Sequence, residues 1–155
     1  MPFYSRKATR IPAYDYSSCN YYFITICTHD KKCIFGKPNA LNIFGQITDK
    51  HVLQLPSYYQ GVSVDKYVVM PNHVHMIIVM SGTDNPSVTQ VVGQLKTGIT
   101  KEIRRNHPDM DVWQRSFHDH IIRSQTDYER IWMYIENNPI RWEEDCFYSV
   151  YVSYE

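Results

Sequence analysis

Residues 67–80, YVVMPNHVHMIIVM, constrain the fold of this chain more than any other run of its sequence. Two apolar segments rich in β-branched residues lie on either side of Pro71 and Asn72, which are residue types that favour tight turns. Length and turn chemistry therefore predict a β-hairpin, with one strand from Gly61 through Met70 and the next from His73 to Met80. The second strand is almost unbroken in apolar character, which is typical of a buried core strand.

Four further segments have the periodicity of regular structure. The β-branched and aromatic run at 20–30 and the run at 117–124 predict two more strands. Apolar residues at helical spacing predict a helix over 40–59, ended by Pro56, and an amphipathic helix over 87–105. The apolar positions of these two helices are Leu41, Phe44, Ile47, Val52 and Leu55, then Val88, Val92, Leu95, Ile99 and Ile103.

A last helix is predicted near the end of the chain. Thr126 and Glu129 have the spacing of a capping box, and Pro139 disfavours helical geometry at Asn138, where we expect the helix to end. The resulting order is β-α-β-β-α-β followed by a helix. This order predicts an α+β fold, a ferredoxin-like or RRM-like antiparallel sheet with helices on one face and an added C-terminal helix.

His73 and His75 are the first candidates for a functional site. Side chains at positions i and i+2 of a strand lie on the same face, roughly 6 to 7 Å apart, so both imidazoles can reach one cation or one phosphate. Because the pair directly follows the turn and opens a core strand, the two rings should be rigidly held, as a metal site requires. The alternative is a row of polar side chains that faces solvent.

A tyrosine and an amide on the last helix are the second candidates. Tyr134 lies near the edge of the predicted buried stripe, and Asn138 projects from the same side one turn further along. The stripe itself consists of Tyr128, Ile131, Trp132 and Ile135. A tyrosine at the edge of a stripe can also serve only in packing.

The composition limits the classes of protein to consider. We expect the 155 residues to form one domain over 19–148, between a basic arm over 1–18 and a tail over 149–155. The 16 basic residues balance the 16 acidic ones, so any binding of nucleic acid must depend on local clusters of charge. The four cysteines lack Cys-x-x-Cys spacing, and we find neither a signal segment nor a membrane span. We therefore expect a cytoplasmic protein with no membrane partner.

The runs YFITICT, YVVMPNHVHMIIV, FHDHIIR and YIENNPIRW, in this order, resemble the single-tyrosine HUH transposases, in particular the REP-associated tyrosine transposases. The resemblance extends from about Arg10 to about Asp145. It implies that His73 and His75 bind Mg²⁺ or Mn²⁺ and that Tyr134 is the catalytic nucleophile.

The resemblance also implies a third metal ligand and a reaction. Asn138 matches the position of the third ligand, with Asn137 and Glu136 as alternatives. The implied reaction is the cleavage and rejoining of single-stranded or hairpin DNA through a 5′-phosphotyrosine. A homodimer, in which Tyr134 serves the histidine pair of a second copy, remains open.

Two groups of basic residues are candidates for contact with DNA. One group lies on the N-terminal arm and the other on the helix over 87–105, where a face that is only solvated is the alternative. These residues are Arg6, Lys7 and Arg10, and Lys96, Lys101, Arg104 and Arg105.

Other readings of the histidines are less consistent with the sequence. His118 and His120 form a second His-x-His on the strand over 117–124, and structural hydrogen bonding accounts for them better than metal binding does. A histidine-triad nucleotide hydrolase needs a third histidine where this chain has Ile77. A non-catalytic RRM-like module that binds single-stranded nucleic acid would need a glycine-aromatic motif, which the chain lacks.

Overall fold

The computed structural model describes residues 20–82, 85–145 and 147. Its centre is a four-stranded antiparallel sheet with the strand order β4-β5-β1-β6. The four strands are β1 (Asn20–Cys27), β4 (Val62–Met70), β5 (His73–Met80) and β6 (His118–Ile122). A small separate ribbon pairs β2 (Gly36–Lys37) with β3 (Ala40–Leu41). The predicted hairpin is confirmed, because β4 and β5 pair directly across Pro71 and Asn72.

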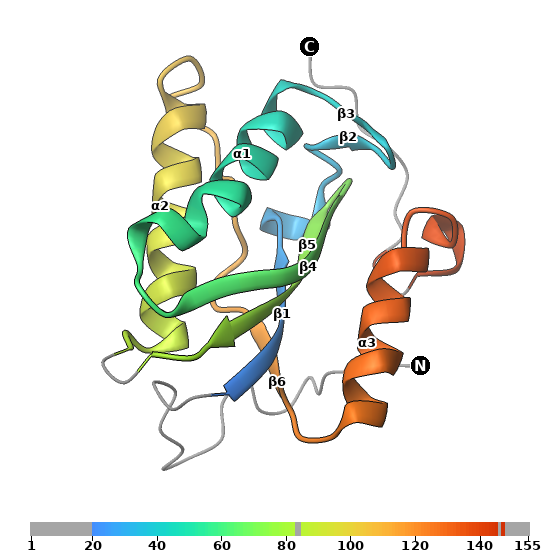
Figure 1. The fold of residues 1–155 in the computed structure, drawn as a ribbon. Helices are drawn as coiled ribbons and strands as arrows, with labels where there is room; N and C mark the ends of the chain where they lie inside the picture. Colours follow the sequence, from blue (N-terminus) through green and yellow to red (C-terminus); the bar gives the residue numbers. More distant parts are fainter. Residues whose placement is uncertain (1–19, 83–84, 146, 148–155) are drawn as a thin grey trace.

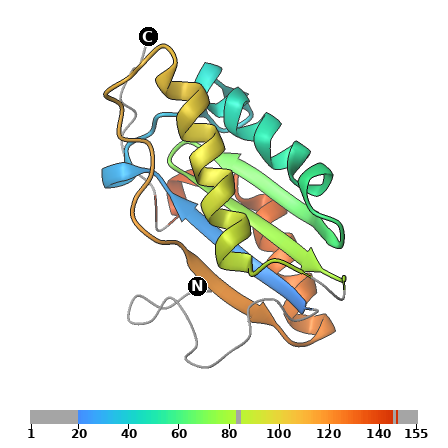
Figure 2. The ribbon, with the colours of Figure 1, turned by 90° about the vertical axis from the view of Figure 1, so that its left-hand side faces the viewer.

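Helices cover both faces of the sheet (Figure 1). The helices α1 (Ile43–Tyr58) and α2 (Val88–Arg104) lie on one face, and α3 (Gln125–Asn137) lies on the other. Figure 2 shows α1 and α2 in front of the sheet and α3 behind it. This arrangement confirms the ferredoxin-like fold with an added C-terminal helix.

Alternation along β5 divides the core into two parts, because successive side chains of a strand point to opposite faces. Met76, Ile78 and Met80 pack with the apolar stripes of α1 and α2, whereas Ile77 and Val79 pack with α3. All eight residues of β5 are buried, as expected for a strand that is covered on both faces. His73 and His75 share the parity of Ile77 and therefore face α3.

The first predicted helix is wrong at its start and in the role given to Pro56, whereas the end of its predicted range, Tyr59, lies one residue beyond the observed end. Ala40 and Leu41 pair with β2, so α1 begins only at Ile43, after Asn42 has capped it by accepting a hydrogen bond from the Gly45 N–H. Pro56 lies inside the last turn and does not end the helix. A proline there removes a single hydrogen bond, and burial of the preceding Leu55 in the core holds the turn.

The capping box predicted for the last helix is also wrong, by two residues. Ser124 is the N-cap, because its backbone is extended and its hydroxyl accepts a hydrogen bond from the Asp127 N–H at 3.1 Å. Thr126 therefore already lies in the first turn of α3. The other end is close to the prediction, since α3 ends at Asn137 and Asn138 is its C-cap. Within the part of the chain that the structure describes, no helix has the length and apolar character needed to cross a membrane.

Candidate active site

His73 and His75 lie fully buried between the sheet and α3. Asn72, in the turn before β5, donates its amide hydrogens to the carbonyls of Lys31 and Phe147, which leaves its side-chain oxygen to accept a hydrogen bond from His73 Nδ1 at 2.8 Å. The turn residue thus orients the His73 ring and directs Nε2 away from the turn. On the neighbouring strand β1, Thr25 hydrogen-bonds His75 Nδ1 at 2.8 Å.

Burial controls the protonation of the pair. Removal from water lowers the pKa of both imidazoles, that of His75 well below its ordinary value of 6.5, and the neighbouring His73 lowers the pKa of His75 further. The negative charge of Asp145 opposes this effect at His73 but does not outweigh it. Both rings are therefore neutral at pH 7, which is the form that binds metal ions.

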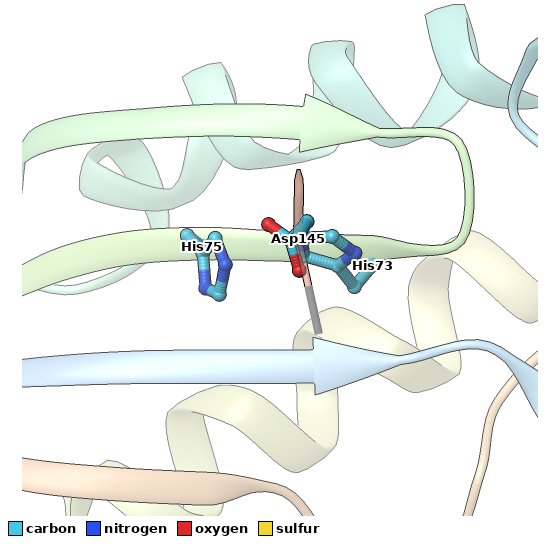
Figure 3. Close-up of side chains that lie close together, drawn as sticks. All are labelled: His73, His75 and Asp145. Atoms are coloured by element: carbon cyan, nitrogen blue, oxygen red, sulfur yellow. The ribbon is translucent and has the colours of Figure 1, made fainter. Parts of the chain in front are cut away.

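Asp145 joins the two histidines from the segment that follows α3 (Figure 3). One potential ligand atom from each of His73, His75 and Asp145 lies within 4.8 Å of the other two. Both His75 Nε2 and Asp145 Oδ2 are buried, and neither has a hydrogen-bond partner among the described residues. Asp145 was not predicted as a site residue from the sequence, because no spacing or periodicity relates it to the strand that carries the histidines.

Tyr134 lies against the same pair. Its ring is half-buried on α3, with its centroid 5.3 Å from that of His75 and 6.2 Å from that of Phe23. Asn138 is buried one turn further along, and its side-chain oxygen lies 3.3 Å from His73 Nε2. The structure thus brings together the four residues that the sequence analysis selected as nucleophile and metal ligands.

The two alternatives to Asn138 lie differently. Glu136 is exposed and forms an ion pair with Lys66, which itself lies over the ring of Trp132. Asn137 is half-buried and lines the same surface pocket as Tyr134 and Asn138. Of the two, only Asn137 therefore borders the pocket.

This pocket gives solvent access to the tyrosine and has a volume of about 380 Å³. Arg130 and Arg141 contribute two positive charges to its lining, and Asp145 and Glu144 contribute two carboxylates. A phosphate group that enters the pocket would therefore meet guanidinium groups beside Tyr134.

The basic residues predicted on α2 lie on the other face of the sheet. They line a groove of about 800 Å³ between α2 and residues 113–116. Lys96 donates hydrogen bonds to the carbonyls of Gln114 and Ser116 and so holds this segment in place. Arg104 donates one to the carbonyl of Met110, in the loop that precedes the segment. The other members of the group are Lys101 and Arg105. The predicted arm residues, Arg6, Lys7 and Arg10, lie outside the described residues.

The second His-x-His pair, on β6, faces α3 as well. His118 and His120 pair with Thr25 and Phe23 of β1, and paired residues of neighbouring strands point to the same face of the sheet. His120 Nε2 lies 2.7 Å from an oxygen of Asp127, near the start of α3. Neither histidine belongs to the group of potential metal ligands found within the described part of the chain.

Comparison with known proteins shows the family of this chain. A family model described as IS200-like transposase matches residues 15–138, and the chain belongs to this family. A Haemophilus influenzae protein of unassigned function is 34% identical over 168 residues, which cover 92% of this chain and 93% of that protein. A second protein from the same organism, named as a REP-associated tyrosine transposase, is 23% identical over 137 residues, covering 82% of this chain and 74% of that protein.

Two solved structures share the fold. A REP-associated tyrosine transposase bound to a REP hairpin superposes with a TM-score of 0.63 at 18% identity, covering 86% of this chain and 74% of that chain. A Deinococcus radiodurans protein assigned to the transposases superposes with a TM-score of 0.55 at 16% identity, covering 84% of this chain and 97% of that chain. The family match, together with the REP-associated relatives, confirms the resemblance to the single-tyrosine HUH transposases of the REP-associated branch. Membership of the family implies transposase activity and the use of a divalent metal ion.

Proposed function

We propose that this protein cleaves and rejoins single-stranded DNA through a covalent 5′-phosphotyrosine formed on Tyr134. The observation that carries the proposal is the contact of the Tyr134 ring with His75, beside a buried histidine pair and next to an open pocket lined by arginines. A nucleophile, a metal-binding pair and a surface for phosphate thus meet at one place.

The reaction is a transfer of a phosphoryl group between two oxygens. The phenolic oxygen of Tyr134 loses its proton and forms a bond to phosphorus, while the bond from phosphorus to the 3′ oxygen breaks and that oxygen becomes a hydroxyl. Attack by a 3′-hydroxyl of another strand reverses the step and releases the tyrosine. Because the phosphodiester bond energy is retained in the intermediate, the cycle needs no nucleotide cofactor.

His73 and His75 would hold Mg²⁺ or Mn²⁺, and Asn138 is a candidate for a third ligand because its oxygen lies beside His73 Nε2. The site suits a cation, since buried Nε2 of His75 and Oδ2 of Asp145 have no hydrogen-bond partner within the described segments. When bound, such an ion polarises the scissile phosphate and offsets the charge of the transition state. A phenol with an ordinary pKa near 10 needs this assistance at neutral pH.

The substrate we propose is DNA that carries a hairpin. The related transposase of similar fold is bound to a REP hairpin. Lys96, Lys101, Arg104 and Arg105 and the arm residues Arg6, Lys7 and Arg10 are the proposed contacts to its phosphates. Since the α2 groove and Tyr134 lie on opposite faces of the sheet, a DNA that reaches both would have to pass around the edge of the molecule. A homodimer that shares one hairpin, with Tyr134 serving the second copy, is the alternative arrangement.

Neither competing function gains support from the structure. An RRM-like module binds bases on an open sheet, whereas helices cover both faces of this sheet. The third histidine of a histidine-triad hydrolase is replaced by Ile77, which is fully buried against α3.

The experiment is incubation of the protein with a 3′-end-labelled DNA hairpin that carries a single-stranded extension, in Mn²⁺, followed by denaturing electrophoresis. Wild type should form a labelled covalent adduct, and Tyr134→Phe should form none. Tyr128→Phe is the matched control, because it removes a hydroxyl from the same helix, one that donates to Asp65 instead of lying at the site. An adduct that survives in Tyr134→Phe would show that another residue is the nucleophile.

A further inference from the structure

The side chains of His73, His75 and Asp145 converge at the site, yet two of their buried polar atoms lack a hydrogen-bond partner among the described residues. His75 Nε2 and Asp145 Oδ2 are both buried without a hydrogen-bond partner among the described residues, and they lie close to the His73 ring. A buried carboxylate oxygen that lacks a donor destabilises the protein, because its lost hydration is not replaced by a hydrogen bond. A divalent cation bound between these side chains would satisfy all three groups at once.

We propose that Asp145 is a direct ligand of the divalent ion and adds a carboxylate to the His73–His75 pair. This inference rests on the proposed metal-dependent function but goes beyond it, because the ligand comes from a different part of the chain. The match to the family model ends at residue 138, so Asp145 lies outside the matched region. The segment after α3 therefore completes the metal site in this protein.

Two buried aromatic residues hold Asp145 at the site. Trp142 and Phe147 are 4% and 3% exposed, and both belong to one buried cluster with Met70 at the end of β4. The Phe147 ring lies 4.6 Å from the ring of His73, and its carbonyl accepts a hydrogen bond of 2.7 Å from the Asn72 amide. Phe147 therefore anchors the segment after α3 to the turn that orients His73.

The carboxylate itself is oriented by its own backbone segment. The Phe147 N–H donates to Asp145 Oδ1 at 2.8 Å, and the Asp145 N–H donates to the carbonyl of Trp142 at 3.1 Å. With Oδ1 engaged, Oδ2 is the oxygen that remains for a metal ion.

A carboxylate at this position changes which ions the site prefers. Two imidazoles alone favour Zn²⁺, whereas Mg²⁺ and Mn²⁺ prefer oxygen ligands that carry negative charge. Asp145 supplies such an oxygen, and Asn138 can supply only a neutral one. The choice of ion by this protein thus depends on the segment after α3.

Calorimetric titration with MnCl₂ and, separately, with ZnCl₂ tests the proposal on metal-free wild type and on Asp145→Asn. The substitution preserves the shape of the side chain and the acceptor for the Phe147 N–H, so the segment should stay in place. Loss of a group that merely orients a metal ligand typically weakens metal binding about 10- to 100-fold. Loss of a direct ligand should therefore weaken Mn²⁺ binding at least about tenfold, and should weaken Zn²⁺ binding less.

Glu144→Gln is the matched control, because it removes an exposed carboxylate from the adjacent position and the same pocket. Its Mn²⁺ affinity should stay within about twofold of wild type, since a solvated charge outside the ligand group is largely screened. Unchanged Mn²⁺ binding in Asp145→Asn would overturn the proposal. An equal loss of affinity for Mn²⁺ and Zn²⁺ would overturn it too, because it indicates that Asp145 only positions another ligand.

A second measurement uses wild type alone, in case Asp145→Asn does not fold. Anomalous scattering from Mn²⁺ in wild-type crystals should place the ion against Asp145, and an ion bound to the histidines without Asp145 would overturn the proposal. Failure of this proposal can be told apart from failure of the proposed function. If wild type binds Mn²⁺ through Asp145 but forms no covalent adduct with DNA, the role of Tyr134 is refuted. If wild type forms the adduct and Asp145→Asn binds Mn²⁺ as tightly as wild type, only the role of Asp145 is refuted.

Discussion

The buried histidine pair should make the stability of the metal-free protein depend on pH. In the unfolded chain both imidazoles are hydrated and take up protons as the pH falls through about 6.5. In the folded protein burial lowers the pKa of His73 and His75, so both rings stay neutral over the same interval. The unfolded state then binds more protons than the folded state. The stability is therefore fully present above pH 6.5 and is lost as the pH falls towards the folded pKa values.

The size of the effect follows from proton linkage. A group that binds a proton only in the unfolded state reduces the free energy of unfolding by about 1.4 kcal/mol for each pH unit. For His75, whose pKa is the more clearly lowered because His73 adds to the effect of burial, the loss between pH 6.5 and pH 5 is about 2 kcal/mol. This is a large fraction of a typical stability of about 5 to 15 kcal/mol.

The measurement is urea denaturation in a chelating buffer at several pH values from 7.5 to 5. His75→Asn removes the titrating ring but leaves an amide near the Thr25 hydroxyl. Between pH 6.5 and pH 5 the free energy of unfolding of this variant should therefore fall by about 2 kcal/mol less than that of wild type. His107→Asn, at an exposed position, is the control and should follow wild type. If wild type and His75→Asn lose stability in parallel, the ring is not held neutral by burial and the reasoning is refuted.

Two further predictions concern the support of Tyr134 and the contact with DNA. Ile131→Ala should lower the free energy of unfolding by about 2 to 5 kcal/mol, because Ile131 is fully buried where α3 packs on Phe23 of the sheet; a loss below about 1 kcal/mol in urea denaturation would contradict this packing. Replacing the exposed Lys101 and Arg105 together with glutamine should reduce the slope of log affinity against log salt by about 1.5 for a DNA hairpin, as the loss of two phosphate contacts requires. An unchanged slope in a binding titration would show that DNA does not occupy the α2 groove.

The parts of the site that could be predicted are those in which local spacing decides the outcome. Alternation along a strand already places His73 and His75 on one face, and helical spacing places Tyr134 and Asn138 on one side of the last helix. Both relations hold in the structure, because each depends only on residues a few positions apart. The same reason explains why the amphipathic α2 was predicted to within one residue at each end.

Other features depended on contacts between distant segments. Nothing local indicates that α3 crosses the face of the sheet that carries the histidines while α2 covers the other, yet this choice separates the predicted basic residues of α2 from Tyr134. The start of α1 was mispredicted for a similar reason, since pairing of Ala40 with β2 competes with the local helical pattern.

The sequence by itself determined the order of the four main strands and three α-helices, the shared face of the histidine pair and the position of the tyrosine relative to Asn138. Only the tertiary structure decided that these two pairs meet and that Asp145 joins them. The physical reason is that periodicity states which residues of one element share a face, whereas the meeting of two elements depends on how the whole core packs. Asp145 lies in a short, aperiodic segment held by Trp142 and Phe147, and its position therefore exists only once the ends of β4 and β5 are in place to receive those rings.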